Sequence, residues 1–268
     1  MPKLTGVDLL LFTVDPGWGA DVVAAGAAGI VVDWERRGKH RRQLGEGTQI
    51  NGDTPADLSR MRAATDGRLI CRINGFGPWT PAEVDDAVAR GADELLLPMV
   101  RTPEQVDRTL EAVAGRCGLG ILVETQDGVG RVAELASRPL SRMYLGLNDL
   151  RIDRGSSVLF APLVDGTADR VRAACSVPFG VAGLTRPDAG WPVPSRLLAG
   201  ELARTGAAFT FLRRSFTADV AGRDLQVEVP RILADCAAAR RRTAGQVLAD
   251  RVELLSAVGP LDRVAQPA

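Results

Sequence analysis

Residues 120–150, GILVETQDGVGRVAELASRPLSRMYLGLNDL, contain two short apolar runs separated by a helical pattern. The runs, 120–124 and 142–148, are apolar throughout rather than alternating, which is typical of strands that are buried on both faces. Residues 128–138 between them carry apolar side chains at helical spacing. A strand, a helix and a strand in this order predict one unit of a parallel α/β sheet.

The same unit recurs along almost the whole chain. Further strands are expected at residues 8–14, 29–34, 68–74, 93–99, 177–182 and 207–213. Three helices between them should begin at Thr54, Thr80 and Thr102, each followed by Pro and by an acid in the first turn. Eight strands alternating with helices predict a single (β/α)8 barrel. A doubly wound sheet is the alternative, because alternation alone does not establish closure.

The predicted barrel occupies residues 1–226. Residues 227–268 form a predicted C-terminal helical extension, rich in Ala and Arg, that packs on the barrel or on a neighbouring subunit. The charges of Arg240–Arg242 fit a solvated helix face.

Composition excludes several classes of function. Thirty-three acidic residues balance thirty-three basic ones, so no basic excess favours nucleic acid. No long uncharged apolar run predicts a membrane span, and the N-terminus is a poor signal peptide. The four cysteines lie far apart, which favours reduced thiols and a cytoplasmic location.

Lysine and histidine are scarce. The two lysines, Lys3 and Lys39, lie near the terminus and in a polar segment, so a lysine-imine mechanism is not expected. The single histidine, His40, excludes a multi-histidine metal site and makes a Ser-His-Asp triad improbable.

Two acids follow adjacent predicted strands. Glu124 and Asp149 each come after a buried apolar run, where a carboxylate needs compensation for lost hydration. One Mg²⁺ ion bound by both would provide it, because Mg²⁺ prefers oxygen ligands. Arg72, at the end of another strand, would then face a developing oxyanion. Alternatively, the two acids cap the next helices or pair with arginines.

Other polar residues follow the remaining strands. Asp33 and Glu35 end the second strand, and Arg213 and Arg214 end the eighth. The loop GLTRPDAG, residues 183–190, and Trp191 could form a lid in which Arg186, Arg213 or Arg214 faces a second acidic group of the substrate. The alternative is that the prolines shape this loop and the arginines form surface ion pairs.

Five motifs in this order and spacing resemble one family. GIVVDWE, CRING, GADELLLPMVRTPEQV, ILVETQDGV and YLGLNDL, within residues 26–155, are similar to the HpcH/HpaI aldolase and citrate lyase β-subunit family. The resemblance implies a barrel of the phosphoenolpyruvate/pyruvate superfamily. It also implies Mg²⁺ or Mn²⁺ held by Glu124 and Asp149, and homo-oligomers, either trimers or hexamers.

The resemblance further implies roles at the substrate. Arg72 would bind the carbonyl or enolate oxygen of a 2-oxo acid or acyl thioester. Backbone N–H groups around Gly146, Asn148 and Asp149 would hold the substrate carboxylate. The family reaction is reversible carbon–carbon cleavage through a metal-stabilised enolate.

The chain departs from the family at its catalytic base. The aldolases have a histidine where Arg36 stands, and the citrate-lyase branch has an acid there and a lysine where Met99 stands. Glu35 or Asp33 could replace the base through a water molecule, or His40 could enter from its loop.

The leading hypothesis is a metal-dependent (class II) aldolase acting on a small 2-oxo acid or related carboxylate. One alternative is an acyl-CoA lyase or thioesterase of the citrate-lyase type. The other is a barrel that has lost its base and binds a carboxylate ligand or a partner subunit.

Overall fold

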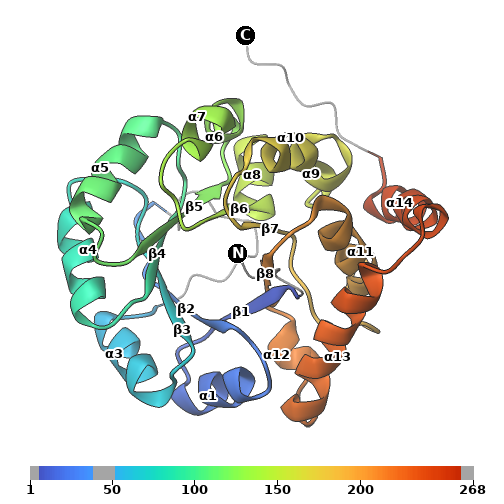
Figure 1. The fold of residues 1–268 in the computed structure, drawn as a ribbon, viewed down its shortest axis with the longest axis horizontal. Coiled ribbons are helices and arrows are strands. Elements are labelled where there is room, and N and C mark those ends of the chain that lie inside the picture. Colours follow the sequence, from blue (N-terminus) through green and yellow to red (C-terminus); the bar gives the residue numbers. More distant parts are fainter. Residues whose placement is uncertain (1–5, 39–51, 261–268) are drawn as a thin grey trace.

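The computed structural model describes residues 6–38 and 52–260. Eight parallel strands form a closed barrel in sequence order, with β8 paired to β1, so the doubly wound alternative is excluded (Figure 1). Each strand overlaps a predicted one. The strands are β1 (Asp8–Phe12), β2 (Gly29–Asp33), β3 (Arg68–Arg72), β4 (Glu94–Leu97), β5 (Gly118–Val123), β6 (Arg142–Leu145), β7 (Phe179–Val181) and β8 (Phe209–Phe211).

Helices surround the barrel in the order that the sequence predicts (Figure 1). They are α1 (Pro16–Ala24), α3 (Pro55–Ala64), α4 (Thr80–Ala89), α5 (Pro103–Val113), α6 (Gln126–Gly130), α7 (Val132–Ala136), α8 (Leu147–Asp153), α9 (Ala161–Val164), α10 (Thr167–Ala174), α11 (Ser195–Thr205), α12 (Phe216–Asp219), α13 (Leu225–Ala239) and α14 (Ala244–Val258). Among the described residues, none of these helices combines the length and apolar content needed to cross a bilayer.

All three predicted Thr-Pro helix starts are confirmed to within one residue. Thr54 caps α3 and shares a capping box with Asp57, and Thr102 is the N-cap residue of α5. The helix α4 begins at Thr80, but this residue is its first helical position and not its N-cap, which is Trp79. The Thr80 hydroxyl instead accepts from the N–H of Gly77 at 3.0 Å, which stabilises the turn before the helix.

Both faces of the strands are buried, which explains their continuous apolar sequence. Successive side chains point to opposite faces, so one set packs against the helices and the other fills the barrel. The interior set consists of Leu10, Val31, Ile70, Leu96, Leu122, Tyr144, Phe209 and Phe211. This filled interior leaves the strand ends as the place for a site.

A buried ion pair lies at the N-terminal end of the barrel interior. The carboxylate of Glu94, the first residue of β4, accepts from the Nε of Arg142, the first residue of β6, at 2.6 Å. The Arg142 guanidinium also lies over the ring of Phe209, 4.7 Å from its centroid. Polar groups at this end of such a barrel serve stability.

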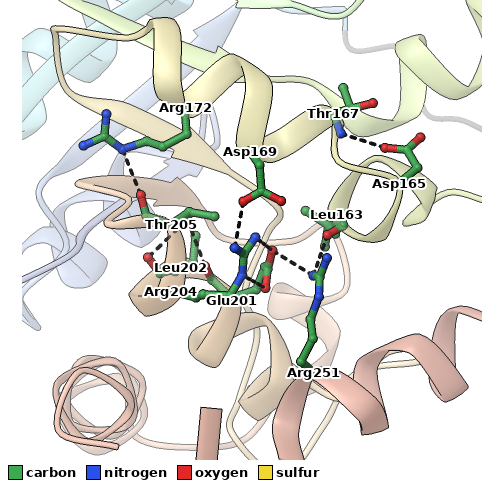
Figure 2. Close-up of polar contacts among 10 residues, drawn as sticks. All are labelled: Leu163, Asp165, Thr167, Asp169, Arg172, Glu201, Leu202, Arg204, Thr205 and Arg251. Atoms are coloured by element: carbon green, nitrogen blue, oxygen red, sulfur yellow. Dashed lines mark hydrogen bonds and ion pairs between the residues drawn. The ribbon is translucent and has the colours of Figure 1, made fainter. Parts of the chain in front are cut away.

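The C-terminal helices differ in their relation to the ring. α13 packs on α11 and α1, so it is the eighth helix of the barrel, and the predicted boundary after residue 226 falls inside it (Figure 1). Among the helices of residues 6–38 and 52–260, α14 is the one that lies outside the ring (Figure 1). Its Arg251 binds the buried Glu201 of α11 at 3.2 Å, and Arg204 binds the same carboxylate (Figure 2).

Candidate active site

A cavity of about 650 Å³ opens at the C-terminal ends of the strands. This is the end of a (β/α)8 barrel at which active sites form. The polar and charged residues predicted for the site that line it are Arg72, Glu124, Asn148, Asp149, Arg213 and Arg214. Aromatic rings of Phe12, Tyr144, Phe160, Trp191 and Phe211 complete much of the wall.

The strand register brings Glu124 against Gly146. Val123 of β5 pairs with Leu145 of β6, so the residues that follow them, Glu124 and Gly146, lie side by side. A Cβ on Gly146 would lie 2.4 Å from the Oε2 atom of Glu124, which leaves room only for glycine. The other carboxylate oxygen of Glu124 accepts from the N–H of Met99 at 2.9 Å. Met99 has a left-handed backbone (φ 56°), a strained conformation that recurs at functional sites.

The Glu124 carboxyl is held in an unfavourable electrostatic environment. Burial, followed by the negative charges of Asp149 and Glu35, raises its pKa to about 8, although Arg72 acts in the opposite direction. Two carboxylates therefore share one cavity without enough positive charge to keep both ionised at neutral pH. A divalent cation between Glu124 and Asp149 would supply that charge.

The ligand set fits Mg²⁺ or Mn²⁺. Within residues 6–38 and 52–260, no group of three or more His, Cys, Asp or Glu side chains is arranged to hold a metal. Glu124 and Asp149 are the two carboxylates that line the cavity, and they would be the side-chain ligands of such an ion. Mg²⁺ is commonly bound in this way, by one or two carboxylates.

Arg72 enters the cavity as a fixed positive charge. Its Nε and Nη2 atoms donate to the two oxygens of Asp33 at 2.8 and 2.7 Å, because Asp33 and Arg72 are register partners on β2 and β3. Burial alone would lower the pKa of Arg72, but Asp33 and Glu35 raise it well above its usual range. The guanidinium also lies 4.9 Å from the ring centroid of Phe12.

Asp33 and Glu35 lie behind Arg72 and are not among the residues that line the cavity. Both oxygens of Asp33 accept from Arg72, so its geometry is that of a positioning residue rather than of a base. Glu35 is buried, and its Oε2 atom lies 3.6 Å from the Nε of Arg72. A role for Glu35 as the base, through a water molecule, stays a prediction.

Asn74 determines the course of the chain after β2. Its Oδ1 atom accepts from the backbone N–H groups of Arg36 and Arg37 at 2.8 and 2.7 Å. The side chain of Arg36, at the position of the family histidine, donates to the carbonyl of Asp53. The hypothesis that His40 enters the site concerns a residue outside the described ranges.

The predicted carboxylate-binding backbone needs one correction. The N–H of Gly146 donates to the carbonyl of Val123 at 3.1 Å as part of the barrel, so it is not available to a substrate. Asn148 and Asp149 lie in the first turn of α8 and line the cavity, and N–H groups of a first turn point out of the helix N-terminus. Their place in the predicted site is therefore compatible with the backbone.

The loop arginines separate into two groups. Arg186 forms ion pairs with Asp188 at 2.6 Å and Glu228 at 3.3 Å, so the ion-pair interpretation holds for this residue, but the pair with Glu228 is largely buried and not on the surface. Arg213 and Arg214 instead line the cavity.

Sequence reasoning missed Tyr144. This residue belongs to an apolar run of β6, and nothing in its spacing distinguishes it from a core residue. In the structure it lines the cavity, and its hydroxyl donates to the carbonyl of Ala182, which has a left-handed backbone (φ 63°). Burial, and then the charge of Glu124, raise the pKa of Tyr144 above its usual range.

No family profile matches the chain. In sequence it resembles indole-3-glycerol phosphate synthase from Aromatoleum aromaticum, with 32% identity over 123 residues. The match covers 46% of this chain and 44% of that enzyme, so it spans less than half of the curated relative.

Solved structures align over most of the chain. An HpcH/HpaI aldolase/citrate lyase family protein from Burkholderia cenocepacia matches with TM-score 0.59 and 16% identity, covering 78% of this chain and 88% of that one. The chain has the barrel fold of the HpcH/HpaI aldolases. Tryptophan synthase from M. tuberculosis aligns equally well in this fold, with TM-score 0.59, 16% identity and coverage of 87% and 94%. The likeness therefore establishes the architecture, and the chemistry must be argued from the site.

Proposed function

We propose that the chain is a member of the HpcH/HpaI family and a divalent-metal-dependent carbon–carbon lyase. It would act through an enolate on a small 2-oxo acid or related carboxylate. The observation that carries this proposal is the meeting of Glu124, Asp149 and Arg72 in one cavity at the C-terminal strand ends. Two carboxylates and a fixed guanidinium are suited to an enolate, because its oxygen carries the negative charge that develops in the reaction.

Glu124 and Asp149 would hold Mg²⁺ or Mn²⁺, which when bound would act as a Lewis acid toward the substrate carbonyl. Arg72 would donate to the same oxygen as negative charge develops on it. Asp33 would keep the guanidinium in place through its two hydrogen bonds. The backbone N–H groups of Asn148 and Asp149 would receive the substrate carboxylate. Such preorganised donors lower the barrier because they need not reorient during the reaction.

Proton removal from the carbon next to the carbonyl requires a base. We propose Glu35, acting through a water molecule, because both oxygens of Asp33 are already engaged with Arg72. Returning the proton to the same carbon would complete the cycle. Without an aldehyde acceptor, this sequence exchanges substrate hydrogen with solvent.

The test is hydrogen exchange at the methyl group of pyruvate. The protein is incubated with pyruvate and Mg²⁺ or Mn²⁺ in D₂O, and the methyl signal is followed by NMR. We expect metal-dependent deuterium uptake that is lost in Glu124→Gln and Asp149→Asn and retained in Arg196→Gln. Arg196 is a suitable control because it forms a surface ion pair with Glu253.

Absence of exchange in a wild-type protein that binds Mn²⁺ would contradict the proposal. It would favour an acyl-CoA lyase or thioesterase, or a barrel that only binds a carboxylate. If exchange occurs, formation of a new carbon–carbon bond with added aldehydes would distinguish an aldolase from other enolate enzymes.

A further inference from the structure

Two arginines follow β8 on the wall of the same cavity. Arg213 and Arg214 come directly after Leu212 and lie among the residues that line it. Glu124 directly follows β5, and Asp149 lies in the first turn of α8, after β6. Strand β7 separates β6 from β8 in the barrel. The cavity thus has a second charged wall, beyond the residues that the proposed reaction uses.

Backbone carbonyls fix the orientation of Arg213. Its Nε donates to the carbonyl of Gly183 at 3.0 Å, and Nη2 donates to that of Val193 at 3.4 Å. The guanidinium carbon lies 5.3 Å from the ring centroid of Phe160. These contacts hold the head group in one direction, but none of them supplies negative charge.

Neither arginine has a carboxylate partner in residues 6–38 or 52–260. Asp219 is the carboxylate that most influences Arg213, yet it lies beyond ion-pair distance and accepts from the Thr185 hydroxyl instead. Arg214 makes no hydrogen bond or ion pair within those ranges, and its pKa is lowered by partial burial and then by the charge of Arg72. The wall beside β8 therefore carries two guanidinium groups without an ion-pair partner in this part of the protein, although Asp33 and Asp149 act on Arg214 from beyond ion-pair distance.

Several other partly buried arginines in the described residues have carboxylate partners, although Arg172 donates to backbone carbonyls instead. Arg142 binds Glu94, Arg186 binds Glu228, and Arg204 binds Glu201. Removing a guanidinium from water without a counter-charge is costly, so the pairing is physically expected. Arg213 is half-buried and lines the cavity, but it has no carboxylate partner among the described residues. A ligand that brings its own negative charge would restore the pattern.

We infer that Arg213 and Arg214 bind a second anionic group of the substrate. The substrate class is then a 2-oxo acid, or its aldol product, with a carboxylate or phosphate at the end remote from the carbonyl. This inference rests on the proposed function, which places the first carboxylate near α8. Arginine suits the role because its planar guanidinium binds carboxylate or phosphate through two parallel hydrogen bonds.

The test compares three acids by calorimetric titration in Mg²⁺. They are 2-oxoglutarate, 2-oxo-4-phosphonobutyrate and 2-oxopentanoate, which share a 2-oxo acid group and differ in the remote group. We expect the wild type to bind at least one of the two acids with a remote anionic group about tenfold or more tightly than 2-oxopentanoate, since hydrogen bonds to charged groups are the stronger kind. Whichever of these two acids has the higher affinity identifies the remote group.

In the Arg213→Gln/Arg214→Gln variant this preference should disappear, while the affinity for 2-oxopentanoate stays unchanged. Arg196→Gln, outside the cavity, should keep the preference. Equal affinity of the wild type for all three acids would overturn the inference, as would a preference that survives in the double variant. Failure to bind any of them would also overturn it.

Deuterium exchange at C3 of the same acids separates the two proposals. A preference lost in the double variant, without exchange in the wild type, would support the anion site and contradict the lyase. Exchange in the wild type without a preference for a remote anionic group would support the lyase and contradict the anion site.

Discussion

At the residue scale, the tightest constraint in the site is the contact between Gly146 and Glu124. The backbone of Gly146 (φ −80°, ψ 115°) is open to any residue, so steric contact alone requires glycine. We expect Gly146→Ala to displace the Glu124 carboxylate and to reduce Mn²⁺ affinity at least about tenfold, because misplaced ligands bind poorly. Calorimetric titration with Mn²⁺ measures this.

Gly130→Ala is the matched control for that substitution, because a Cβ at Gly130 meets nothing within 4 Å. Unchanged Mn²⁺ affinity in Gly146→Ala would show that Glu124 is not a metal ligand.

The raised pKa of Glu124 predicts a pH-dependent metal site. Because the folded-state pKa is about 8, well above the ordinary value for Glu, the metal-free protein retains this proton at neutral pH. A metal must displace it, so Mn²⁺ affinity should rise about tenfold per pH unit toward pH 8 and then level off. Titrations at several pH values test this, with Glu124→Gln expected to show weak and nearly pH-independent binding.

The same shift has a consequence for stability. A carboxyl whose pKa is raised on folding favours the folded state at low pH, and this contribution is lost as pH rises toward about 8. Without metal, the melting temperature of the wild type should therefore fall over this range more than that of Glu124→Gln. Equal pH profiles of the two proteins would contradict the assignment.

Asp33 is expected to act through Arg72. Asp33→Asn removes the charge and one acceptor of a paired guanidinium, so we expect kcat for exchange to fall on the order of a hundredfold. Mn²⁺ affinity should change little, because Asp33 does not line the cavity. Asp149→Asn, by contrast, should lose both the exchange activity and the Mn²⁺ affinity. Loss of Mn²⁺ binding in Asp33→Asn would mean that Asp33 is a ligand instead.

At the element scale, α14 is attached through its charged residues. Arg251 binds the buried Glu201, which Arg204 also binds at 2.6 and 2.9 Å (Figure 2). Removing the shared carboxylate leaves Arg251 without a carboxylate partner and Arg204 with Asp169 alone, so Glu201→Gln should lower the free energy of unfolding by about 2–3 kcal/mol. Urea denaturation measures this. Glu253→Gln, in an exposed pair with Arg196, should cost less than about 1 kcal/mol.

Element boundaries show what local sequence can predict. The Thr-Pro pattern located α3 and α5, because N-cap and N1 preferences act within one turn. It also located the start of α4 at Thr80, but not the N-cap, which is Trp79. The predicted boundary between the barrel and the C-terminal extension, after residue 226, falls inside α13 for another reason. The composition of 227–239 does not reveal that α13 packs on α1, at the opposite end of the sequence.

At the scale of the whole molecule, the expected trimer or hexamer stays a prediction. On α14 the charged Asp250 and Arg251 form ion pairs with the rest of the protein, while Leu248, Val252 and Leu255 are exposed. Leu254 of the same helix is buried in the core, so the exposed apolar residues lie on another part of its surface, and exposed apolar surface favours association. Light scattering after gel filtration should give three or six times the mass of one chain, and a monomer would contradict this.

The sequence by itself determined the alternation of strands and helices and the candidate residues at the strand ends, whereas closure of the barrel was decided by the tertiary structure. The alternation and the candidate residues follow from local patterns, because continuous apolar strands in alternation with helices must bury both faces, and acids after two such strands reach the same rim. Glu124, Asp149 and Arg72 could be named on this basis. Only the tertiary structure decided which groups face each other across the barrel. It placed Asp33 behind Arg72, engaged the N–H of Gly146 in the sheet, and turned Arg213 toward the cavity. These outcomes depend on strand register and on contacts between distant segments, which spacing along the chain does not specify.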